Sequence, residues 1–383
     1  MRIAMMTDSY YPTRDGVVAS IEATRKSLEA GGHEVFIIAP DPGKGHRTDG
    51  VHYLPARKFK GYEGYFVPIY PSGKVSLLRS LDIDVIHVHG IALMAVKALA
   101  AAKALRVPVI LTFHTMVCDT LEYYSPLNLP TDVLKKLAWI YLRNVLKRVD
   151  GVICPTMSTL SELRKNGVVA KEARVVPTGI DTDRFSTGTD GKRIREKYGL
   201  GDSEVAIHVG RISPEKNIDV IIRAVAETDD LTIMIVGKGP AKDDLERLTE
   251  KLGIEKKVIF TGFVPDDELP EYYGAADVAV SASKFETQGL SVLEAMACGL
   301  PVVCTKDRAF EDFVVDGKNG LFFEGSASEC ADAIRSCVLS KGTLGSGARN
   351  TAETFSLRTS AEAHISLYNN VISAKRKRLG DNG

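Results

Sequence analysis

The stretch that decides the fold is Phe285-Glu286-Thr287-Gln288-Gly289-Leu290-Ser291-Val292-Leu293-Glu294-Ala295-Met296-Ala297-Cys298-Gly299-Leu300-Pro301. An apolar strand is expected before it at 278–280, a helix that begins at Gly289 and ends at Gly299, and a further strand after Pro301. The strands are continuously apolar rather than alternating, which is typical of parallel strands buried on both faces. The stretch therefore predicts one strand–helix–strand unit of a helix-covered parallel sheet.

The same alternation of strand and helix runs through both halves of the chain. Apolar strands are expected at 2–6, 34–39, 85–88, 107–112, 152–154 and 174–176, and then at 205–209, 231–236, 258–260, 278–280, 301–304 and 320–323. A run of Ser, Thr and Gly over 185–191 is typical of a linker. We therefore predict an α/β protein with two Rossmann-like doubly wound domains, 1–180 and 181–355, facing a cleft. A helix over 356–383 is expected to pack back toward the first domain.

The composition excludes several classes of protein. With 44% hydrophobic and 26% charged residues among 383, the chain is neither disordered nor fibrous. Its 49 basic and 49 acidic residues cancel, which argues against a nucleic-acid partner. Residues 1–180, however, hold 23 Lys and Arg against 16 Asp and Glu, so a basic first half is balanced by an acidic second half. This asymmetry indicates either surfaces that face different partners or drift between two solvated surfaces.

The sequence carries no expected targeting or membrane-spanning segment. The apolar run at 2–6 meets polar residues at once, unlike a secretory leader, and no apolar stretch is long enough to span a bilayer. The six cysteines lack the C-x-x-C spacing of zinc or redox motifs, which favours reduced thiols. We therefore expect a cytoplasmic protein, either free or peripheral at the inner face of the cell membrane.

Two carboxylates flank the start of the helix expected after Gly289. A helix N-terminus offers free N–H groups and a partial positive charge, which suit phosphate oxygens. Glu294, inside the helix, can accept hydrogen bonds from a ribose diol, and Glu286, before it, can hold a second polyol. This pattern suits a sugar joined to a nucleoside through a diphosphate. The alternative is a pair of solvated glutamates with no ligand.

The order of motifs along the chain favours the nucleotide-sugar site over a pair of solvated glutamates. The Glu-x7-Glu spacing, followed by Ala295-x-Ala297-x-Gly299-x-Pro301, resembles the retaining glycosyltransferases of family 4, which have the GT-B architecture of two Rossmann-like domains. The resemblance covers most of the chain. Further matches occur, in order, at Ser9-Tyr10-Tyr11-Pro12, Gly32-His33-Glu34-Val35, Asp84-Val85-Ile86-His87-Val88-His89-Gly90, Pro177-Thr178-Gly179-Ile180-Asp181, Val209-Gly210-Arg211 and Gly237-Lys238-Gly239-Pro240.

The resemblance implies roles for four charged residues. Arg211 and Lys216 match the basic pair that binds the donor diphosphate, where fixed cations stabilise the negative charge that grows on the leaving group. Glu294 would hold the ribose. Glu286 would hold a hydroxyl of the donor sugar. The alternative for the two cations is an ordinary charged surface loop.

The resemblance also assigns backbone groups and a histidine to the site. The N–H groups of Gln288, Gly289 and Leu290 would bind donor oxygens, and Gly16 would let the first loop approach the phosphates without a side chain in the way. His114, just past an expected strand end, would face the donor sugar and the reaction centre. A single histidine is more often structural, and its place at a strand end favours the functional role.

No metal and no cofactor are expected beyond a nucleotide-sugar co-substrate, for which we predict UDP-glucose or a similar UDP-hexose. Asp82-x-Asp84 lies at the amino end of its strand, the wrong end for a site, and Asp181-x-Asp183 lies in a separate loop. His87 is expected to pack in its strand and His89 at most to line the cleft. The resemblance implies retention at the anomeric carbon by front-face attack, with the departing phosphate taking the acceptor proton.

The acceptor is expected to bind the basic half. The helix predicted over 132–148 carries basic residues and the only tryptophan, and a second basic, aromatic segment covers 57–70. Basic residues mixed with aromatic ones suit an anionic bilayer, whereas a solvated helix face is the alternative. The residues Glu286-Thr287-Gln288-Gly289 also resemble the diacylglycerol glucosyltransferase branch, so we predict a lipid acceptor. The membrane or acceptor surface is predicted to comprise Lys135, Lys136, Trp139, Arg143 and Lys147.

Three alternatives stay open. The run 116–120, after His114, departs from the Tyr and Asp residues common in the lipid branch, so a soluble sugar, a phosphosugar or inositol phosphate is a second choice of acceptor. A nucleotide-sugar 2-epimerase shares the two-domain cleft but uses several acidic residues around the sugar. A non-catalytic nucleotide-sugar sensor would not need the complete set of charged residues.

Overall fold

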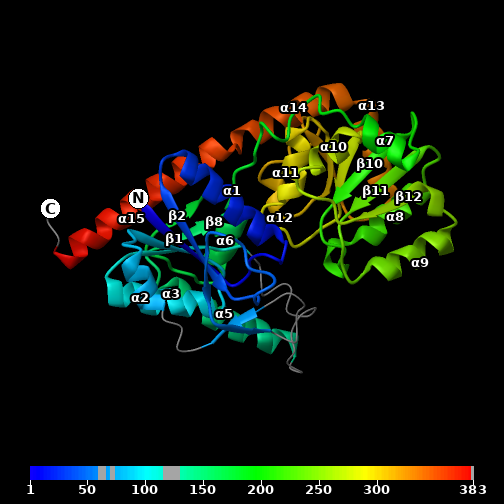
Figure 1. Cartoon of the computed structure of the whole chain (residues 1–383). Coiled ribbons are helices and arrows are strands. Elements are labelled where there is room, and N and C mark those ends of the chain that lie inside the picture. The colour runs from blue at the N-terminus through cyan, green and yellow to red at the C-terminus, as the bar shows by residue number, and fades with distance from the viewer. Residues whose placement is uncertain (59–65, 70–73, 115–129, 381–383) are drawn as a thin grey trace. The chain divides into compact units, whose positions relative to one another are not determined.

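The computed structural model describes residues 1–58, 66–69, 74–114 and 130–380, which form two compact units (Figure 1). Unit 1 comprises Met1–Gly179 together with Leu357–Gly383, and unit 2 comprises Ile180–Ser356. Most of the aromatic segment 57–70 and all of the departing run 116–120 lie outside the described residues. The predicted fold class, two Rossmann-like parallel-sheet domains, is confirmed.

The sheet of unit 1 has seven parallel strands in the order β3-β2-β1-β6-β7-β8-β9. Its strands are β1 (Arg2–Thr7), β2 (Glu34–Pro40), β3 (Val51–Leu54), β6 (Val85–His89), β7 (Val109–Thr112), β8 (Gly151–Cys154) and β9 (Ala173–Val175). The sequence analysis did not expect β3 or the short antiparallel pair of β4 (Ala56–Lys58) and β5 (Phe66–Pro68).

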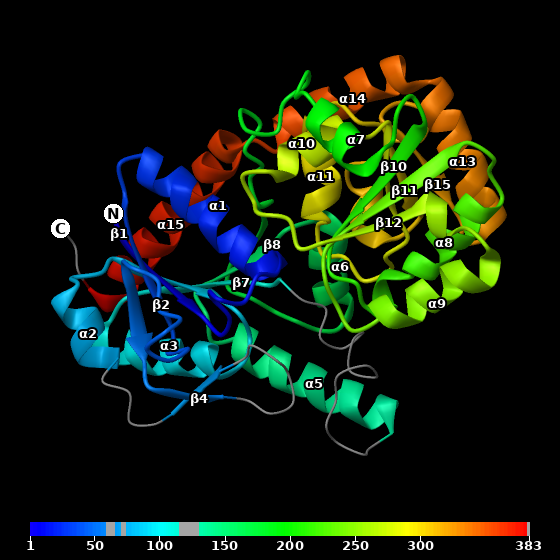
Figure 2. The ribbon, with the colours of Figure 1, turned by 45° about the vertical axis from the view of Figure 1, so that its right-hand side comes forward.

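Helices cover both faces of this sheet (Figure 2). One face packs against α1 (Gly16–Ala30) and α15 (Leu357–Leu379), whose Leu367, Tyr368 and Val371 are buried in the same apolar cluster as Ile3. The other face packs against helices that include α3 (Leu93–Leu105) and α5 (Thr131–Leu146). The remaining helices of unit 1 are α2 (Lys74–Ser80) and α6 (Met157–Lys165). Thus α15, which follows unit 2 in the chain, belongs to the core of unit 1.

The sheet of unit 2 has six parallel strands in the order β12-β11-β10-β13-β14-β15. They are β10 (Glu204–Val209), β11 (Leu231–Val236), β12 (Val258–Gly262), β13 (Val278–Ser281), β14 (Val302–Thr305) and β15 (Gly320–Phe323). The helical segments are α7 (Lys192–Tyr198), η1 (Pro214–Lys216), α8 (Ile218–Ala226), α9 (Lys242–Leu252), η2 (Glu255–Lys257), α10 (Leu269–Gly274), α11 (Leu290–Ala297), α12 (Arg308–Glu311), α13 (Ala327–Leu339) and α14 (Lys341–Thr354).

The strand orders place a crevice in each unit. In unit 1 the chain adds β2 and β3 on one side of β1 and then β6 to β9 on the other, so the order reverses between β1 and β6. In unit 2 the reversal falls between β10 and β13. Ligands of open parallel sheets bind at such switch points, beyond the carboxyl ends of the strands. The loops after β1, β6, β10 and β13 are therefore where functional side chains should gather.

Candidate active site

The loops after β10 and β13 carry the two predicted diphosphate cations and the first glutamate. Arg211 lies two residues past β10 and is exposed, and Lys216 ends the short helix η1. Asn217, in the left-handed region at φ 49°, donates from Nδ2 to the carbonyl oxygen of Ala282, 3.1 Å away. This hydrogen bond ties the loop after β10 to the end of β13, across the switch point of unit 2.

Lys216 and Glu286 form an ion pair across that switch point. The Lys216 Nζ lies 2.5 Å from the Glu286 Oε1, and the two side chains are 21% and 23% exposed. Burial alone would raise the pKa of Glu286, but the charge and hydrogen bond of Lys216, with a hydrogen bond from Ser283, lower it below its ordinary value. The carboxylate is thus ionised and can accept hydrogen bonds from a sugar hydroxyl. The structure brings together two residues that lie 70 positions apart, as the sequence analysis predicted for one site.

The N-terminus of α11 is formed by a residue that must be glycine. Gly289 has φ 81°, and a Cβ placed on it would lie 2.7 Å from the Phe310 ring. Gly289 is the N-cap of the helix and makes no side-chain capping hydrogen bond. Gln288 and Leu290 flank it, and the first N–H groups of a helix have no partner within the helix itself. This arrangement fits the predicted anion site.

Glu294 lies one turn further along α11 and faces Tyr273. Its Oε2 lies 3.0 Å from the Tyr273 hydroxyl, which is also 3.0 Å from the Ser291 carbonyl oxygen. Burial raises the pKa of Glu294 to about 7, although Tyr273 and then Arg184 act to lower it. A phenol has one proton and cannot donate to both oxygens. A protonated Glu294 that donates to the phenol, while the phenol donates to Ser291, satisfies all three groups.

In unit 1, Gly16 begins α1 directly after the helix-capping residue Asp15. The Asp15 Oδ1 accepts from the N–H groups of Val17 and Val18 at 3.0 and 2.9 Å, and the Ser9 hydroxyl lies 3.1 Å from Asp15 Oδ2. A Cβ on Gly16 would meet nothing within 4 Å, so the glycine is not required for packing. This open space is consistent with the predicted role of leaving room for a ligand.

His114 lies two residues past β7 and contacts a second histidine. Its Nε2 is 2.9 Å from the Nδ1 of His89, the last residue of β6, and the two rings are stacked with centroids 5.2 Å apart. Burial, with a smaller contribution from His364, lowers the pKa of His114 to about 3, so the imidazole is neutral. The sequence analysis placed His89 at most on the cleft wall. The structure buries His89, which is 1% exposed, within that limit and makes it a partner of His114, a contact that the sequence analysis did not predict.

The environment of His89 sets the tautomer of this pair. The Nε2 of His89 is buried and has no hydrogen-bond partner among the described residues. A buried N–H without a partner is rarer in proteins than an unsatisfied acceptor, so we place the His89 proton on Nδ1, from which it donates to His114 Nε2. His114 then carries its own proton on Nδ1. His87 packs in β6 as predicted, between the Thr112 hydroxyl at 2.6 Å and the Tyr368 hydroxyl at 2.7 Å.

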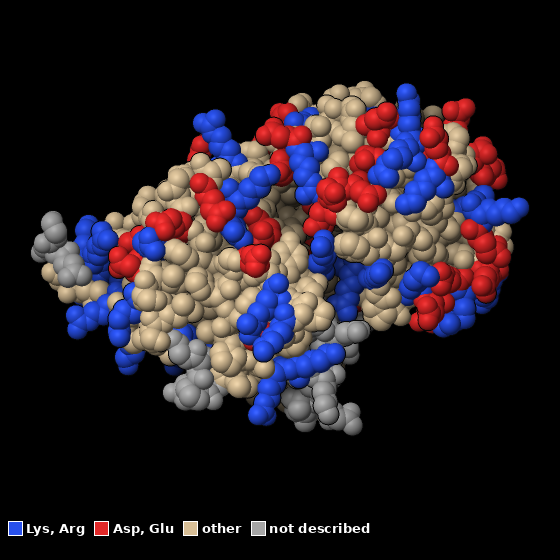
Figure 3. Space-filling model, in the orientation of Figure 1, with Lys and Arg blue, Asp and Glu red and all other residues tan. Residues whose placement is uncertain are grey.

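The residues predicted to form a membrane or acceptor surface lie on helix α5 and at its C-cap, Lys147. Lys136, Arg143 and Lys147 are exposed and Lys135 is partly exposed. Trp139 corrects the prediction, because it is half-buried and packs against the apolar core of unit 1. In Figure 3, Lys and Arg side chains predominate over Asp and Glu along the lower edge of unit 1, where Figure 1 places α5.

Exposed apolar side chains, which the sequence analysis missed, lie on the same helix. Val133, Leu137, Ile140 and Tyr141 are 44%, 52%, 41% and 40% exposed. Their spacing of i, i+4, i+7 and i+8 places them on one stripe of the helix. The sequence carried a signal for these residues, because they recur at the 3.6-residue period of a helix beside the buried apolar residues Leu134, Leu142, Val145 and Leu146. We name these four residues the α5 stripe.

Among residues 1–58, 66–69, 74–114 and 130–380, no helix is long and apolar enough to cross a membrane. No cluster of three His, Cys, Asp or Glu side chains there is arranged to hold a metal ion. Metal independence stays a prediction.

Two Rossmann-like units, with cations, a helix N-terminus and two carboxylates at a switch point, define a GT-B glycosyltransferase. Residues 14–184 match the family described as Glycosyltransferase Family 4, and residues 190–353 match Glycosyl transferases group 1. The chain is 32% identical to the alpha-monoglucosyldiacylglycerol synthase of Acholeplasma laidlawii over 99% of both chains. It is also 32% identical to the Streptococcus pneumoniae enzyme of that name, over 88% of this chain and 78% of the other. The chain therefore belongs to glycosyltransferase family 4 and is a hexosyltransferase.

Other relatives and a solved structure extend the comparison. A GDP-mannose-dependent alpha-mannosyltransferase of Mycolicibacterium smegmatis is 29% identical over 86% of both chains. The crystal structure of Anabaena HepE in complex with UDP-glucose has a TM-score of 0.78 at 21% identity, covering 96% of this chain and 99% of that one. At this identity the structural likeness establishes the fold alone.

The pKa of Glu294 predicts a pH-dependent donor affinity. Between pH 6 and pH 8 this carboxyl passes from mostly protonated to mostly ionised, and the ionised form is the better acceptor for a ribose diol. We expect the Kd for UDP-glucose, which has no titrating group in this range, to fall about tenfold over that interval. Calorimetric titration measures it. Glu294→Gln should bind more weakly with a flat pH profile, and an equally steep profile in this variant would contradict the assignment.

The contact between His89 and His114 predicts that His89 acts as a positioning residue. His89→Leu removes the hydrogen bond that holds the His114 ring, so we expect kcat to fall about tenfold, the equivalent of about 1.4 kcal/mol. The KM for the nucleotide sugar should change little, because donor binding relies mainly on unit 2. His89→Gln, which retains an N–H donor, should recover most of the loss. Initial-rate measurements test this, and a wild-type kcat in His89→Leu would refute it.

Proposed function

We propose that this hexosyltransferase moves glucose from UDP-glucose to a hydroxyl of a diacylglycerol-type lipid at a membrane surface, with retention at the anomeric carbon. The names of the two 32% identical relatives support a glucose transfer to diacylglycerol. The observation that carries the lipid acceptor is the α5 stripe, an exposed apolar row flanked by cations on the basic unit.

The groups of unit 2 account for donor binding in this proposal. Lys216 and Arg211 bind the diphosphate together with the N-terminus of α11, which stabilises the negative charge that develops as the bond from the anomeric carbon to the phosphate oxygen breaks. Glu286, held by Lys216, accepts a hydrogen bond from a sugar hydroxyl. Glu294 binds the ribose diol. These contacts orient the anomeric carbon and use no nucleophilic side chain.

The transfer step then balances without a covalent enzyme intermediate. The lipid hydroxyl oxygen forms a bond to the anomeric carbon on the face that the diphosphate leaves, and its proton passes to the departing phosphate oxygen. The neutral imidazole of His114, whose proton we place on Nδ1, can donate a hydrogen bond to the donor sugar but does not need to accept the proton. His114 thus positions the sugar in unit 1.

The α5 stripe supports a membrane contact. Four half-exposed apolar side chains bury little area individually, but together they can insert into the headgroup region while Lys136, Arg143 and Lys147 attract anionic lipids. Tyr141 is fixed by a hydrogen bond of 2.6 Å from its hydroxyl to the Ile91 carbonyl oxygen, which ties α5 to the loop before α3. Such an amphipathic helix favours a protein that lies peripherally at the membrane, on its cytoplasmic side.

Removal of the ion-pair cation tests the donor site. Lys216→Ala deletes a charge that contacts the leaving diphosphate and leaves Glu286 buried without its partner, so we expect kcat to fall by about 10²–10³-fold. Transfer from radiolabelled UDP-glucose to diacylglycerol in mixed vesicles measures it, and GDP-mannose in parallel tests the donor of the mannosyltransferase relative. Lys251→Ala, an exposed lysine at the end of α9, is the control. Near-normal transfer by Lys216→Ala would contradict the assignment.

The membrane contact is tested by a matched pair of leucines. Leu137→Ser removes an apolar side chain of the α5 stripe, whereas Leu339→Ser alters an 86% exposed leucine of unit 2. We expect Leu137→Ser to weaken co-sedimentation with phosphatidylglycerol vesicles about threefold, because only the exposed half of a side chain whose full burial contributes roughly 1.5 kcal/mol remains to be buried. Leu339→Ser should have no effect. Equal binding by both variants, or efficient transfer to a soluble sugar instead of the lipid, would overturn the lipid proposal.

A further inference from the structure

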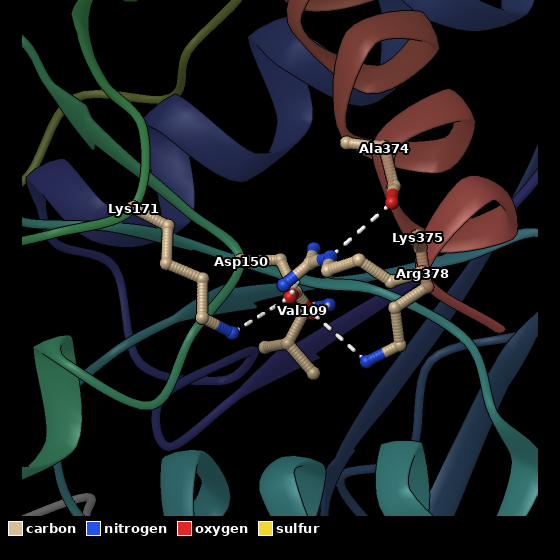
Figure 4. Close-up of polar contacts among 6 residues, drawn as sticks. All are labelled: Val109, Asp150, Lys171, Ala374, Lys375 and Arg378. Carbon is tan, nitrogen blue, oxygen red and sulfur yellow. Dashed lines mark hydrogen bonds and ion pairs between the residues drawn. The ribbon is translucent and has the colours of Figure 1, made fainter.

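A buried carboxylate with three cationic partners lies at the amino edge of the unit 1 sheet. Asp150 directly precedes β8 and is 5% exposed. Its oxygens lie 2.9 Å from Lys171 Nζ, 3.0 Å from Arg378 Nη2 and 3.3 Å from Lys375 Nζ, and they accept the Val109 N–H at 3.1 Å (Figure 4). Lys375 and Arg378 come from the last turns of α15, so the cluster fastens this helix to the sheet.

The cluster holds more positive than negative charge. One carboxylate faces three cations, which leaves a surplus of two positive charges. Burial would raise the pKa of Asp150, but Lys171, the Val109 N–H and Lys375 together lower it, so the carboxylate is ionised at neutral pH. One ion pair between Asp150 and a cation of α15 would be enough to fasten this helix to the sheet. The other two cations are therefore not required for that structural role.

A pocket of about 380 Å³ lies beside the cluster. Lys103, Arg148 and Lys375 line it together with Asp150, and the rest of the lining is Val109 and apolar side chains of α3. Asp150 is the only acidic residue of the lining. Over the described ranges, the Lys103 ammonium has no ion pair or hydrogen bond, and the Arg148 guanidinium donates to oxygens of Asn144, which is neutral. The pocket is therefore cationic on its walls and apolar on one side.

The pocket is distinct from the transfer site of the same unit. Val109 begins β7 at the pocket, whereas His114 lies beyond the opposite end of that strand. Five residues at about 3.3 Å each separate them by roughly 16 Å. The pocket thus lies at the edge of the sheet that parallel-sheet enzymes do not use for their substrates, and none of its residues belongs to the proposed donor or acceptor groups.

We propose that this pocket binds a phosphate group, with Lys103, Arg148 and Lys375 as its ligands. Arginine matches phosphate oxygens with two parallel N–H bonds, and lysine adds point charges. Lys375 makes the longest contact with Asp150, and Lys171 and Arg378 still neutralise that carboxylate when Lys375 turns to a ligand. The apolar side accommodates the carbon atoms of a phosphate ester. A soluble phosphate ester and a phospholipid headgroup share this chemistry.

The test measures the binding of two probes to the full chain. One probe is glycerol phosphate in solution, and the other is phosphatidylglycerol in vesicles, with phosphatidylcholine vesicles as the comparison. Lys103→Glu with Arg148→Glu reverses both walls and should weaken glycerol phosphate binding at least tenfold. Lys251→Glu with Lys256→Glu makes the same change of charge on exposed residues of unit 2 and should leave binding unchanged. If the double variant loses binding of both probes, the phosphate itself is sufficient. If it loses binding only of phosphatidylglycerol vesicles, the ligand is a headgroup, because vesicle binding through the α5 stripe would persist in this variant.

Asp150→Asn separates the proposal from a purely structural cluster. Loss of the carboxylate raises the surplus of positive charge, so phosphate should bind several-fold more tightly even though the Tm falls as α15 loses its fastening. A structural cluster predicts the lower Tm with no gain in phosphate binding. The proposal would be overturned if the wild type bound neither probe. It would also be overturned if the variant that combines Lys103→Glu and Arg148→Glu bound both probes as well as the wild type does.

Discussion

The constraint on which the structure depends is the burial of parallel strands on both faces. Strands such as β6 and β13, whose residues are all buried, can only be reached at their ends, so the faces are reserved for packing and chemistry is confined to the edges. In each unit the order of strands reverses once, and the loops on either side of that reversal hold the candidate groups. The ion pair of Lys216 and Glu286 joins two such loops and shows how the topology brings distant residues together.

Helices and strands were predicted best where a local sequence signal marked an element that is also buried. The bounds of α1 follow from local signals of this kind, because Asp15 caps its start and Gly31-Gly32 ends it, and both signals act within a few residues. The strand β3 was missed, because Val51–Leu54 is a four-residue edge strand that contains a histidine and is only partly buried. The continuous hydrophobicity that identified the inner strands does not occur there.

Side-chain partnerships could not be predicted from one sequence. His89 ends β6 and His114 follows the neighbouring strand β7, 25 residues later, so their contact depends on the register of β6 against β7. Trp139 was assigned to a surface because tryptophan and lysine are mixed in its segment, yet the rotation of α5 turns the indole toward the core and the α5 stripe outward. A segment's composition reports which residues are available, and only packing decides which face they occupy.

The division of charge gains meaning once α15 is assigned to unit 1. With this helix, unit 1 holds 28 Lys and Arg against 18 Asp and Glu, a wider imbalance than the boundary at residue 180 indicates. The cations that α15 contributes do not lie beside the α5 stripe. Two of them, Lys375 and Arg378, contact Asp150 at the amino edge of the sheet. The basic character of unit 1 thus has two separate origins, an amphipathic helix whose cations flank an apolar stripe and a pocket whose cations outnumber their single carboxylate. Solubility alone does not require the amphipathic helix or the cationic pocket. Because like charges repel one another, a surface that only needs to be solvated has no reason to gather its cations in one place.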